Sequence, residues 1–312
     1  MNILFVDHAC HKKTRSADFF LDIIRARHTV DCHYYDTYYK CGIPQDKIAA
    51  ANLIIFWEFL PGRFKIAVSG KPCLFVPMYD NEWGSKWQWR RIARSGMSVL
   101  SFCDALTRHA KSCGVKNILT VHYAMDPSRF PQNTGDPRKA LYWDRGNFPE
   151  PTIRALFEAD ALDELVIQRD FLPPAKYAAF LDRFGVYIAP RAKEGIGMAF
   201  LEQIARGKCV VAHDDATMNE YVTDGQTGIV RNFNAPQKKI TAADVQSVRG
   251  NVRKHADQLY ARWLQERDAI TPFCESAAKL PPAHCGGLAD ILRYYVFLLE
   301  ATVMRLTSRE LA

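Results

Sequence analysis

Continuous apolar runs alternate with helix-like stretches along most of this chain, and this alternation constrains the fold more than any other feature. In the first half the runs are NILFVDH, TVDCHYYD, LIIFWEF, CLFVPMYD, SVLSFC and ILTVHY. Runs of about 4–8 Val, Ile, Leu and Phe residues indicate strands that are buried on both faces, as in a parallel sheet covered by helices. The first half therefore predicts one Rossmann-like domain of the α/β class.

A polar segment rich in Pro and Gly, MDPSRFPQNTGDPRK at residues 125–139, is typical of a linker and precedes a second series of runs. This series is KALYWDR, ELVIQRD, GVYIAP, CVVAHD and TGIVRNF, and from about residue 240 the pattern becomes helical. We predict Rossmann-like domains at 1–130 and 131–240, and C-terminal helices at 241–312 that pack on or bridge them. Open α/β sheets bind ligands at the carboxyl ends of their strands, so function is expected in the cleft between the domains.

Composition excludes several classes of protein. With 48% apolar and 24% charged residues, the 312-residue chain has enough apolar residues for two domains with cores and is not disordered. The start, MNILFVDHACHKK, lacks a signal-peptide core, and no apolar run near the end reaches the roughly 20 residues of a membrane span. Nine cysteines without a CxxC pair are typical of free thiols. We expect a cytoplasmic protein.

The net charge of +7 lies entirely in the first half of the chain. Residues 1–130 hold 18 Lys and Arg against 11 Asp and Glu, whereas residues 131–312 hold 23 of each. This favours an anionic partner, such as a phosphate, an acidic glycan or a membrane surface, but solvated exposed faces explain it equally well. Likewise, EWGSKWQWRRIARSG at 82–96 is either a membrane-interface helix or a half-buried helix with solvated Arg residues.

The stretch from 186 to 230 carries the strongest chemical signal. A predicted strand leads into a loop with Glu194 and two glycines, and then into a helix that starts near Met198. Amides at a helix N-terminus, with glycines that let a ligand approach the backbone, suit a diphosphate. Glu194 and Glu202 then lie at different distances from it and can hold hydroxyls on its two sides. The alternative is that Glu202 is a surface residue and Glu194 interacts with the helix dipole.

This stretch resembles the donor-binding signature of the retaining GT-B nucleotide-sugar glycosyltransferases, especially the family-four group. The signature is a Glu-x7-Glu motif with EGIG, followed by GKCVVA and NEYVTDGQTGIV. The resemblance implies a GT-B fold, retention of anomeric configuration, a UDP- or GDP-sugar as the donor, and no metal or other cofactor. It implies that Glu194 contacts the donor sugar, that Glu202 contacts the ribose, and that the amides of Gly195, Ile196 and Gly197 bind the sugar and diphosphate.

Cationic residues are expected to stabilise the departing diphosphate. At the start of the second domain the family often has an Arg followed by a Lys; here Arg145 is present, but Glu150 or its neighbours occupy the Lys position. Arg191, Lys193 or Arg169 would restore the charge, because several placements of a cation can neutralise a leaving group.

The first domain supplies candidate acceptor contacts. KPCLFVPMYD resembles a family strand that ends in His-Asp, with Tyr79 in place of His and with Asp80 retained as a candidate base. The first loop and the nearby aromatic residues complete the set, which is His11, Lys12, Lys13, Arg15, Tyr79 and Trp83. Thr227 is expected in the loops around the donor. A zinc site at His8, Cys10 and His11 is an alternative for the first loop, although no distant fourth ligand is marked.

The expected function is transfer of a sugar to a glycan or lipid-linked glycan, as in bacterial-type surface polysaccharide synthesis. The expected partners are a nucleotide sugar, the acceptor, the inner face of a membrane and a second copy through the C-terminal helices, with no nucleic acid. Two alternatives stay open: a catalytically silent sugar-nucleotide-binding partner of another transferase, and a basic nucleic-acid-binding module.

Overall fold

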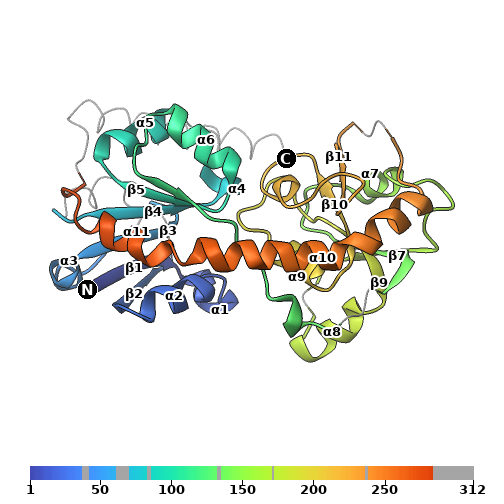
Figure 1. Cartoon of the computed structure of the whole chain (residues 1–312), viewed down its shortest axis with the longest axis horizontal. Helices are drawn as coiled ribbons and strands as arrows, with labels where there is room; N and C mark the ends of the chain where they lie inside the picture. The colour runs from blue at the N-terminus through green and yellow to red at the C-terminus, as the bar shows by residue number, and fades with distance from the viewer. Residues whose placement is uncertain are drawn as a thin grey trace, which may run out of the picture.

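The computed structural model describes residues 1–36, 42–60, 70–82, 86–131, 135–170, 172–235 and 238–283. Within these residues all paired strands run parallel and form two sheets, one of six strands and one of five (Figure 1). Every apolar run expected to be a strand contributes one. The two sheets define a first lobe and a second lobe, which lie side by side along the longest axis of the molecule.

The first lobe contains the six-stranded sheet, with strand order β2-β1-β3-β4-β5-β6. Its strands are β1 Asn2–His8, β2 Thr29–Tyr35, β3 Leu53–Glu58, β4 Cys73–Pro77, β5 Ser98–Ser101 and β6 Ile118–Thr120. Its helices are α1 Ala9–Thr14, α2 Asp18–Arg25, α3 Gln45–Ala50, α4 Tyr79–Glu82, α5 Lys86–Ser95 and α6 Asp104–Ser112. The central strands β3 and β4 are almost entirely buried, which explains their unbroken apolar sequences.

The second lobe contains the five-stranded sheet, with strand order β11-β10-β9-β7-β8. Its strands are β7 Asp136–Trp143, β8 Glu164–Gln168, β9 Phe184–Ile188, β10 Cys209–His213 and β11 Ile229–Arg231. Its helices are α7 Glu150–Ala155, α8 Pro174–Leu181 and α9 Met198–Ala205, and short 3₁₀ turns occupy η1 Pro127–Arg129 and η2 Met218–Glu220. Helix α9 begins at the position that the sequence predicted, and Gly207 follows its end with φ +78°.

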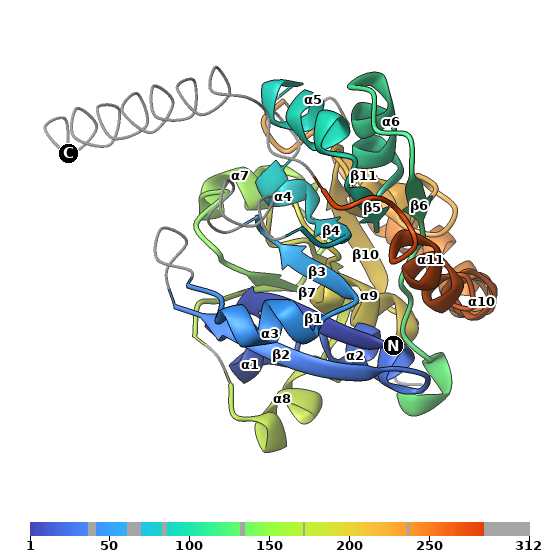
Figure 2. The same cartoon turned by 90° about the vertical axis from the view of Figure 1, so that its left-hand side faces the viewer.

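A long helix, α10 Ala242–Arg267, joins the lobes along one side (Figures 1 and 2). A capping box between Thr241 and Asp244 starts it, and its buried Val residues at 245, 248 and 252 pack toward the second lobe. Helix α11 Ile270–Ala277 then packs against α2 and β4 of the first lobe. The chain therefore crosses between the lobes twice within the described residues. The predicted domain boundaries at 130 and 240 stay predictions.

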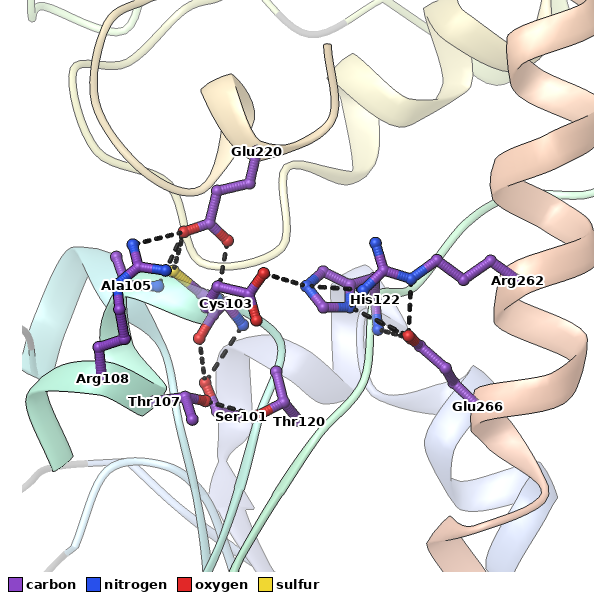
Figure 3. Close-up of polar contacts among 11 residues, drawn as sticks. Ser101, Cys103, Ala105, Thr107, Arg108, Thr120, His122, Glu220, Arg262 and Glu266 are labelled. Atoms are coloured by element: carbon purple, nitrogen blue, oxygen red, sulfur yellow. Dashed lines mark hydrogen bonds and ion pairs between the residues drawn. The ribbon is translucent and has the colours of Figure 1, made fainter. Parts of the chain in front are cut away.

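Polar contacts also connect the lobes, in a cluster that we call the interlobe latch: Asp104, His122, Glu220, Arg262 and Glu266. Figure 3 labels the last four of these residues. Glu220 extends from η2 of the second lobe and accepts hydrogen bonds from the amides of Asp104 and Ala105, at 2.7 and 2.8 Å. It thereby satisfies free amides at the N-terminus of α6 and interacts favourably with the helix dipole. Glu266 of α10 accepts a 2.5 Å hydrogen bond from the amide of His122.

Helix α5 belongs to the segment 82–96, for which the sequence left open a membrane-interface helix or a half-buried helix. Trp89 is fully buried and Arg91 is only 8% exposed, whereas Arg90 and Arg94 are exposed, so α5 is a half-buried helix that keeps two of its three Arg residues in solvent. Trp83 and residues 284–312 lie outside the described residues. Among the described residues, no helix combines the length and apolar character that crossing a membrane requires.

Candidate functional site

A cavity of about 700 Å³ lies between the lobes, at the carboxyl ends of the strands. Residues from the first lobe form one side of it, the first-lobe wall: Cys10, His11, Thr14, Ser16, Trp57, Glu58, Met78 and Asp80. Residues from the second lobe form the opposite side, the second-lobe wall: Trp143, Arg145, Pro190, Arg191, Glu194, Gly195, Ile196, Gly197, Met198, Ala199 and Glu202. Met125 also lines the cavity.

The loop between β9 and α9 forms the centre of the second-lobe wall. Gly197 precedes the first residue of α9 with φ +74°, a left-handed conformation that glycine adopts without strain. A Cβ on Gly195 would lie 3.1 Å from Cβ of Met78, so the absence of a side chain lets the two lobes approach closely here. Thr217 donates hydrogen bonds to the carbonyls of Glu194 and Gly195, which fixes the loop. Backbone amides at a helix N-terminus that glycines leave accessible are able to bind an anion.

Glu202 lines the same cavity from the second turn of α9. Arg206, one helical turn further, donates a 2.9 Å hydrogen bond from Nε to Oε1 of Glu202. Arg206 is 5% exposed, its guanidinium also contacts Asp182, and it lies over the ring of Phe130. A planar guanidinium held on three sides restricts the rotamers of the carboxylate that it binds. Glu202 is therefore a fixed hydrogen-bond acceptor at the cavity surface.

Arg191 bridges the two walls. Its Nη1 lies 3.2 Å from Oδ2 of Asp80 in the first lobe and 3.5 Å from Oε1 of Glu194 in the second. Burial raises the pKa of Glu194 to about 7, although Arg191 opposes the increase. Burial and the charge of Glu58 likewise raise the pKa of Asp80 to about 6. Two carboxyl groups that titrate near neutrality, with a shared cation, are typical of a functional site.

A doubly paired histidine occupies the first-lobe wall. His11 contacts Oδ1 of Asp7 through Nδ1 at 2.6 Å and Oε2 of Glu58 through Nε2 at 2.8 Å. Burial alone lowers the pKa of His11, but the hydrogen bonds and charges of Asp7 and Glu58 outweigh it and raise the pKa to about 10. His11 is therefore an imidazolium at neutral pH and donates from both ring nitrogens.

A second, smaller pocket of about 300 Å³ adjoins the cavity and shares Trp143 with it. Its lining is mostly apolar and aromatic, with two polar residues: Leu141, Trp143, Gln168, Asp170, Leu172, Tyr177, Phe180, Leu181 and Tyr187. A pocket with aromatic walls and few polar groups suits a flat heterocyclic ring.

Comparison with known proteins finds a family match for part of the chain. Residues 154–246 match the family model described as "Glycosyl transferases group 1", and this segment contains the β9–α9 loop, Glu194 and Glu202. No curated protein sequence matches the chain significantly.

Solved structures resemble the whole chain. HepE of Anabaena, solved with UDP and glucose, has a TM-score of 0.57 at 14% identity over 90% of this chain and 100% of its own. Sucrose-phosphate synthase from Thermosynechococcus elongatus has a TM-score of 0.55 at 12% identity over 88% of this chain and 98% of its own. The fold is GT-B. The lipopolysaccharide outer core galactosyltransferase WaaB is similar at TM-score 0.52 and 11% identity, over 90% of this chain and 96% of its own.

Several predicted site residues line the GT-B cavity. They are Glu194, Gly195, Ile196, Gly197, Glu202, Arg145 and Arg191 on the second-lobe wall, and His11 and Asp80 on the first-lobe wall. Arg145 stacks on Trp143, with 5.1 Å between its guanidinium carbon and the ring centroid. The motif and the cavity therefore coincide.

Other predicted residues do not line this cavity. Lys12 and Lys13 are exposed, and Arg15 pairs with Asp18. Tyr79 donates a 2.7 Å hydrogen bond to Asp215 of the second lobe. Three further predicted residues, Lys193, Arg169 and Thr227, also lie outside the cavity lining. Arg169 contacts Asp144 and Glu150. Thr227 accepts a hydrogen bond from the amide of Thr223. Their roles in ligand binding stay predictions.

Sequence reasoning missed three features of the site. Glu58 and the buried Asp7 each lie at the carboxyl end of an apolar strand, which was a usable signal. Trp143 belongs to the run KALYWDR, from which we predicted a strand and no site residue other than Arg145. None of the three belongs to a local motif, so their convergence was not apparent from the chain.

Three residues of the interlobe latch are of types that can bind a metal ion. Ligand atoms of Asp104, His122 and Glu220 lie within 4.8 Å of one another. However, Glu220 already accepts the amide hydrogens of α6. Nη2 of Arg262 lies 2.6 Å from Nδ1 of His122 and adds a positive charge beside the ring. These contacts explain the cluster as a structural link between the lobes.

Proposed function

We propose that this chain is a glycosyltransferase that moves a sugar, with retention of anomeric configuration, from a nucleoside-diphosphate sugar to a glycan or lipid-linked glycan. The observation that supports this most strongly is the second-lobe wall, where Glu194, the amides at 195–197 and Glu202 line one cavity with Arg145 and Arg191. We assign the nucleoside ribose to Glu202, the donor sugar to Glu194 and the diphosphate to the amides and cations. The GT-B fold and the match to the glycosyltransferase family agree with this assignment.

The base of the nucleotide fits the smaller aromatic pocket. It adjoins the cavity at Trp143, and its walls include Tyr177 and Phe180. Aromatic rings stack on a base irrespective of its identity, whereas Gln168 and Asp170 offer hydrogen-bonding groups to its edge. In this proposal the base, the ribose and the diphosphate lie along one wall.

The chemistry then follows from charge. The bond between the anomeric carbon and the diphosphate oxygen breaks, and the acceptor oxygen forms a new bond to that carbon. Positive charge develops on the sugar and negative charge on the diphosphate, which Arg145, Arg191 and the α9 amides stabilise. The acceptor proton passes to an oxygen of the departing diphosphate, or to Asp80 as the candidate base. No metal is required for this scheme.

The acceptor and setting are further parts of the proposal. HepE was solved with UDP-glucose, and WaaB is a lipopolysaccharide galactosyltransferase, so a surface polysaccharide or its lipid-linked precursor is a reasonable acceptor. We propose a cytoplasmic enzyme that contacts the inner face of the membrane and self-associates through its C-terminal helices. The domain division proposed from the sequence assigns the acceptor to residues 1–130 and the donor to 131–240.

A catalytically silent sugar-nucleotide-binding protein is the second candidate. Glu150 stands where a Lys was expected. Arg169, one of the cations expected to restore the charge, contacts the carboxylates of Glu150 and Asp144. Such a protein would bind the donor without cleaving it.

Thermal stability with UDP, GDP or ADP tests the proposal first, because a ligand bound only by the folded state stabilises it. One of the three should raise the melting temperature. Mass spectrometry with the corresponding nucleotide sugars and glycan acceptors should then detect transfer. Binding without hydrolysis or transfer would favour the silent protein, and no stabilisation by any nucleotide would overturn both candidates.

A further inference from the structure

The first-lobe wall is acidic, although the first lobe as a whole is basic. Asp7 is the next-to-last residue of strand β1, Glu58 is the last residue of β3, and Asp80 lies in α4 just after β4. These strands are neighbours in the sheet and run parallel, so their carboxyl ends meet at one edge. Three carboxyl groups from distant parts of the chain therefore gather next to the cavity.

A continuous chain of polar contacts connects these groups to the second lobe. His11 joins Asp7 to Glu58, and Nδ2 of Asn81 donates to Oε1 of Glu58 at 2.5 Å. The same Asn81 nitrogen lies 3.3 Å from Oδ1 of Asp80, whose other oxygen contacts Arg191. The side chains of Glu58 and Asp80 are 14% and 18% exposed, so they are fixed in place but still accessible from the cavity.

The charge of this wall is negative after pairing. His11 supplies one positive charge against the three carboxylates of Asp7, Glu58 and Asp80, and Arg191 is shared with Glu194. The exposed Lys12 and Lys13, which contribute to the basic charge of the lobe, are not among the residues that line the cavity. Among the residues of the first lobe that the structure describes, no Lys or Arg lines the cavity.

Hydrogen-bond acceptors keep unused capacity both at this wall, in Glu58 and Asp80, and behind it, in the buried Asp7 that is not part of the cavity lining. Oδ2 of Asp7, a residue 1% exposed, has no hydrogen-bond partner among the described residues. Each carboxylate oxygen of Glu58 and Asp80 accepts at more than one site, so one contact leaves capacity for another. Glu58 also holds a left-handed backbone conformation, φ +66°, that is uncommon outside glycine and concentrates at functional sites.

We propose that Glu58, His11 and Asp80 form the acceptor subsite, and that this subsite takes a hydroxyl-rich sugar that is neutral or carries an amine. The inference rests on the proposed function and deepens it. Sugar hydroxyls and ammonium groups donate to carboxylates, whereas a phosphate or uronate at this position would face uncompensated negative charge. The acidic glycan or phosphate that the net charge suggested is therefore excluded from this subsite.

Saturation-transfer NMR tests the proposal with paired methyl glycosides of glucose, galactose and mannose. Each is offered as the neutral sugar, the 2-amino sugar and the uronic acid, in the presence of whichever of UDP, GDP and ADP stabilises the protein. The wild-type protein should give its strongest signals with neutral or amino members. Stronger signals from the uronic acids, or no signal from any member while that nucleotide binds, would overturn the inference and leave the donor assignment intact. Failure of all three nucleotides to bind would instead count against the proposed function.

A charge-neutral variant sharpens the test. Glu58→Gln keeps the size of the side chain and removes one negative charge, so the preference for neutral over uronic members should fall by about tenfold or more. Asp80→Asn provides a second variant, should Glu58→Gln fail to fold. Asp22→Asn, an exposed residue of α2 outside the cavity lining, is the matched control and should leave the preference unchanged. An unchanged preference in a folded Glu58→Gln protein would refute the subsite.

Discussion

The two walls of the cavity are built in different ways. The second-lobe wall takes most of its lining from one short stretch, residues 190–202, in which the glycine loop that follows strand β9 leads into helix α9. The first-lobe wall is assembled from residues near 10, 58 and 80, which only the parallel sheet brings together. One wall is therefore a local motif that can be recognised in the sequence, and the other is a product of the tertiary fold.

The difference extends to charge. The second-lobe wall combines carboxylates with amides and Arg side chains, which suits an anionic diphosphate flanked by hydroxyls. The first-lobe wall offers carboxylates and a single imidazolium. Substitutions in the two walls should therefore have separate effects. Changes in the second-lobe wall should alter nucleotide binding, and changes in the first-lobe wall should alter acceptor binding.

The largest effect is expected for Glu194 of the second-lobe wall, whose substitution should lower kcat and leave UDP affinity nearly unchanged. Glu194→Gln should lower kcat by about 100- to 1,000-fold, because a preorganised group beside the reacting sugar is lost. The affinity for free UDP should change less than twofold, since we assign Glu194 to the sugar. Steady-state kinetics and calorimetry measure the two quantities. A large loss of UDP affinity in this variant would show that the roles of the two Glu residues are exchanged.

Glu202 should have the next largest effect. Glu202→Ala should weaken UDP binding by about 10- to 100-fold, the value of a hydrogen bond to a charged group, and remove most of the UDP-dependent rise in melting temperature. Arg206→Met should act in the same direction but less strongly, because Arg206 orients Glu202. Glu158→Ala, at an exposed position of the second lobe, is the control. Equal UDP shifts in wild type and Glu202→Ala would contradict the ribose assignment.

A pH series tests the paired histidine of the first-lobe wall. Because the folded protein raises the pKa of His11 to about 10, its contribution to stability is complete below the ordinary value near 6.5 and is lost as pH rises through 10. At pH 7 the wild type should therefore melt about 2–4 °C above His11→Gln. This gap should shrink between pH 7 and pH 10.5, as measured by differential scanning fluorimetry. A gap that grows with pH would exclude the imidazolium pairing.

The smallest effect is expected outside both walls, at the interlobe latch. Glu220→Gln should cost about 1 kcal/mol, because an ionised cap at the N-terminus of α6 becomes neutral. UDP affinity at the second-lobe wall should be nearly unchanged. Chemical denaturation and calorimetry measure these quantities. If Glu220→Gln weakened UDP binding as strongly as Glu202→Ala, the donor site would depend on how the lobes are held together.

The fold was predictable because its information is local and repeated. Each buried strand required an unbroken apolar run, and each of these runs is a strand in the structure. The second-lobe wall was predictable for the same reason, because a single loop and the helix that follows it set the positions of Glu194 and Glu202. Arg145 was also found from its place after β7, and it does line the cavity.

The sequence by itself determined two sheets of buried parallel strands and the glycine loop before α9, because periodicity and backbone chemistry act over a few neighbouring residues. Only the tertiary structure decided that Asp7, His11, Glu58 and Asp80 share one edge, because strand order in a sheet is unrelated to distance along the chain. It also decided that Lys12 and Lys13 are exposed away from the cavity lining while carboxylates of Glu58 and Asp80 line it. Long-range packing and desolvation set that outcome, and neither is encoded within any single segment.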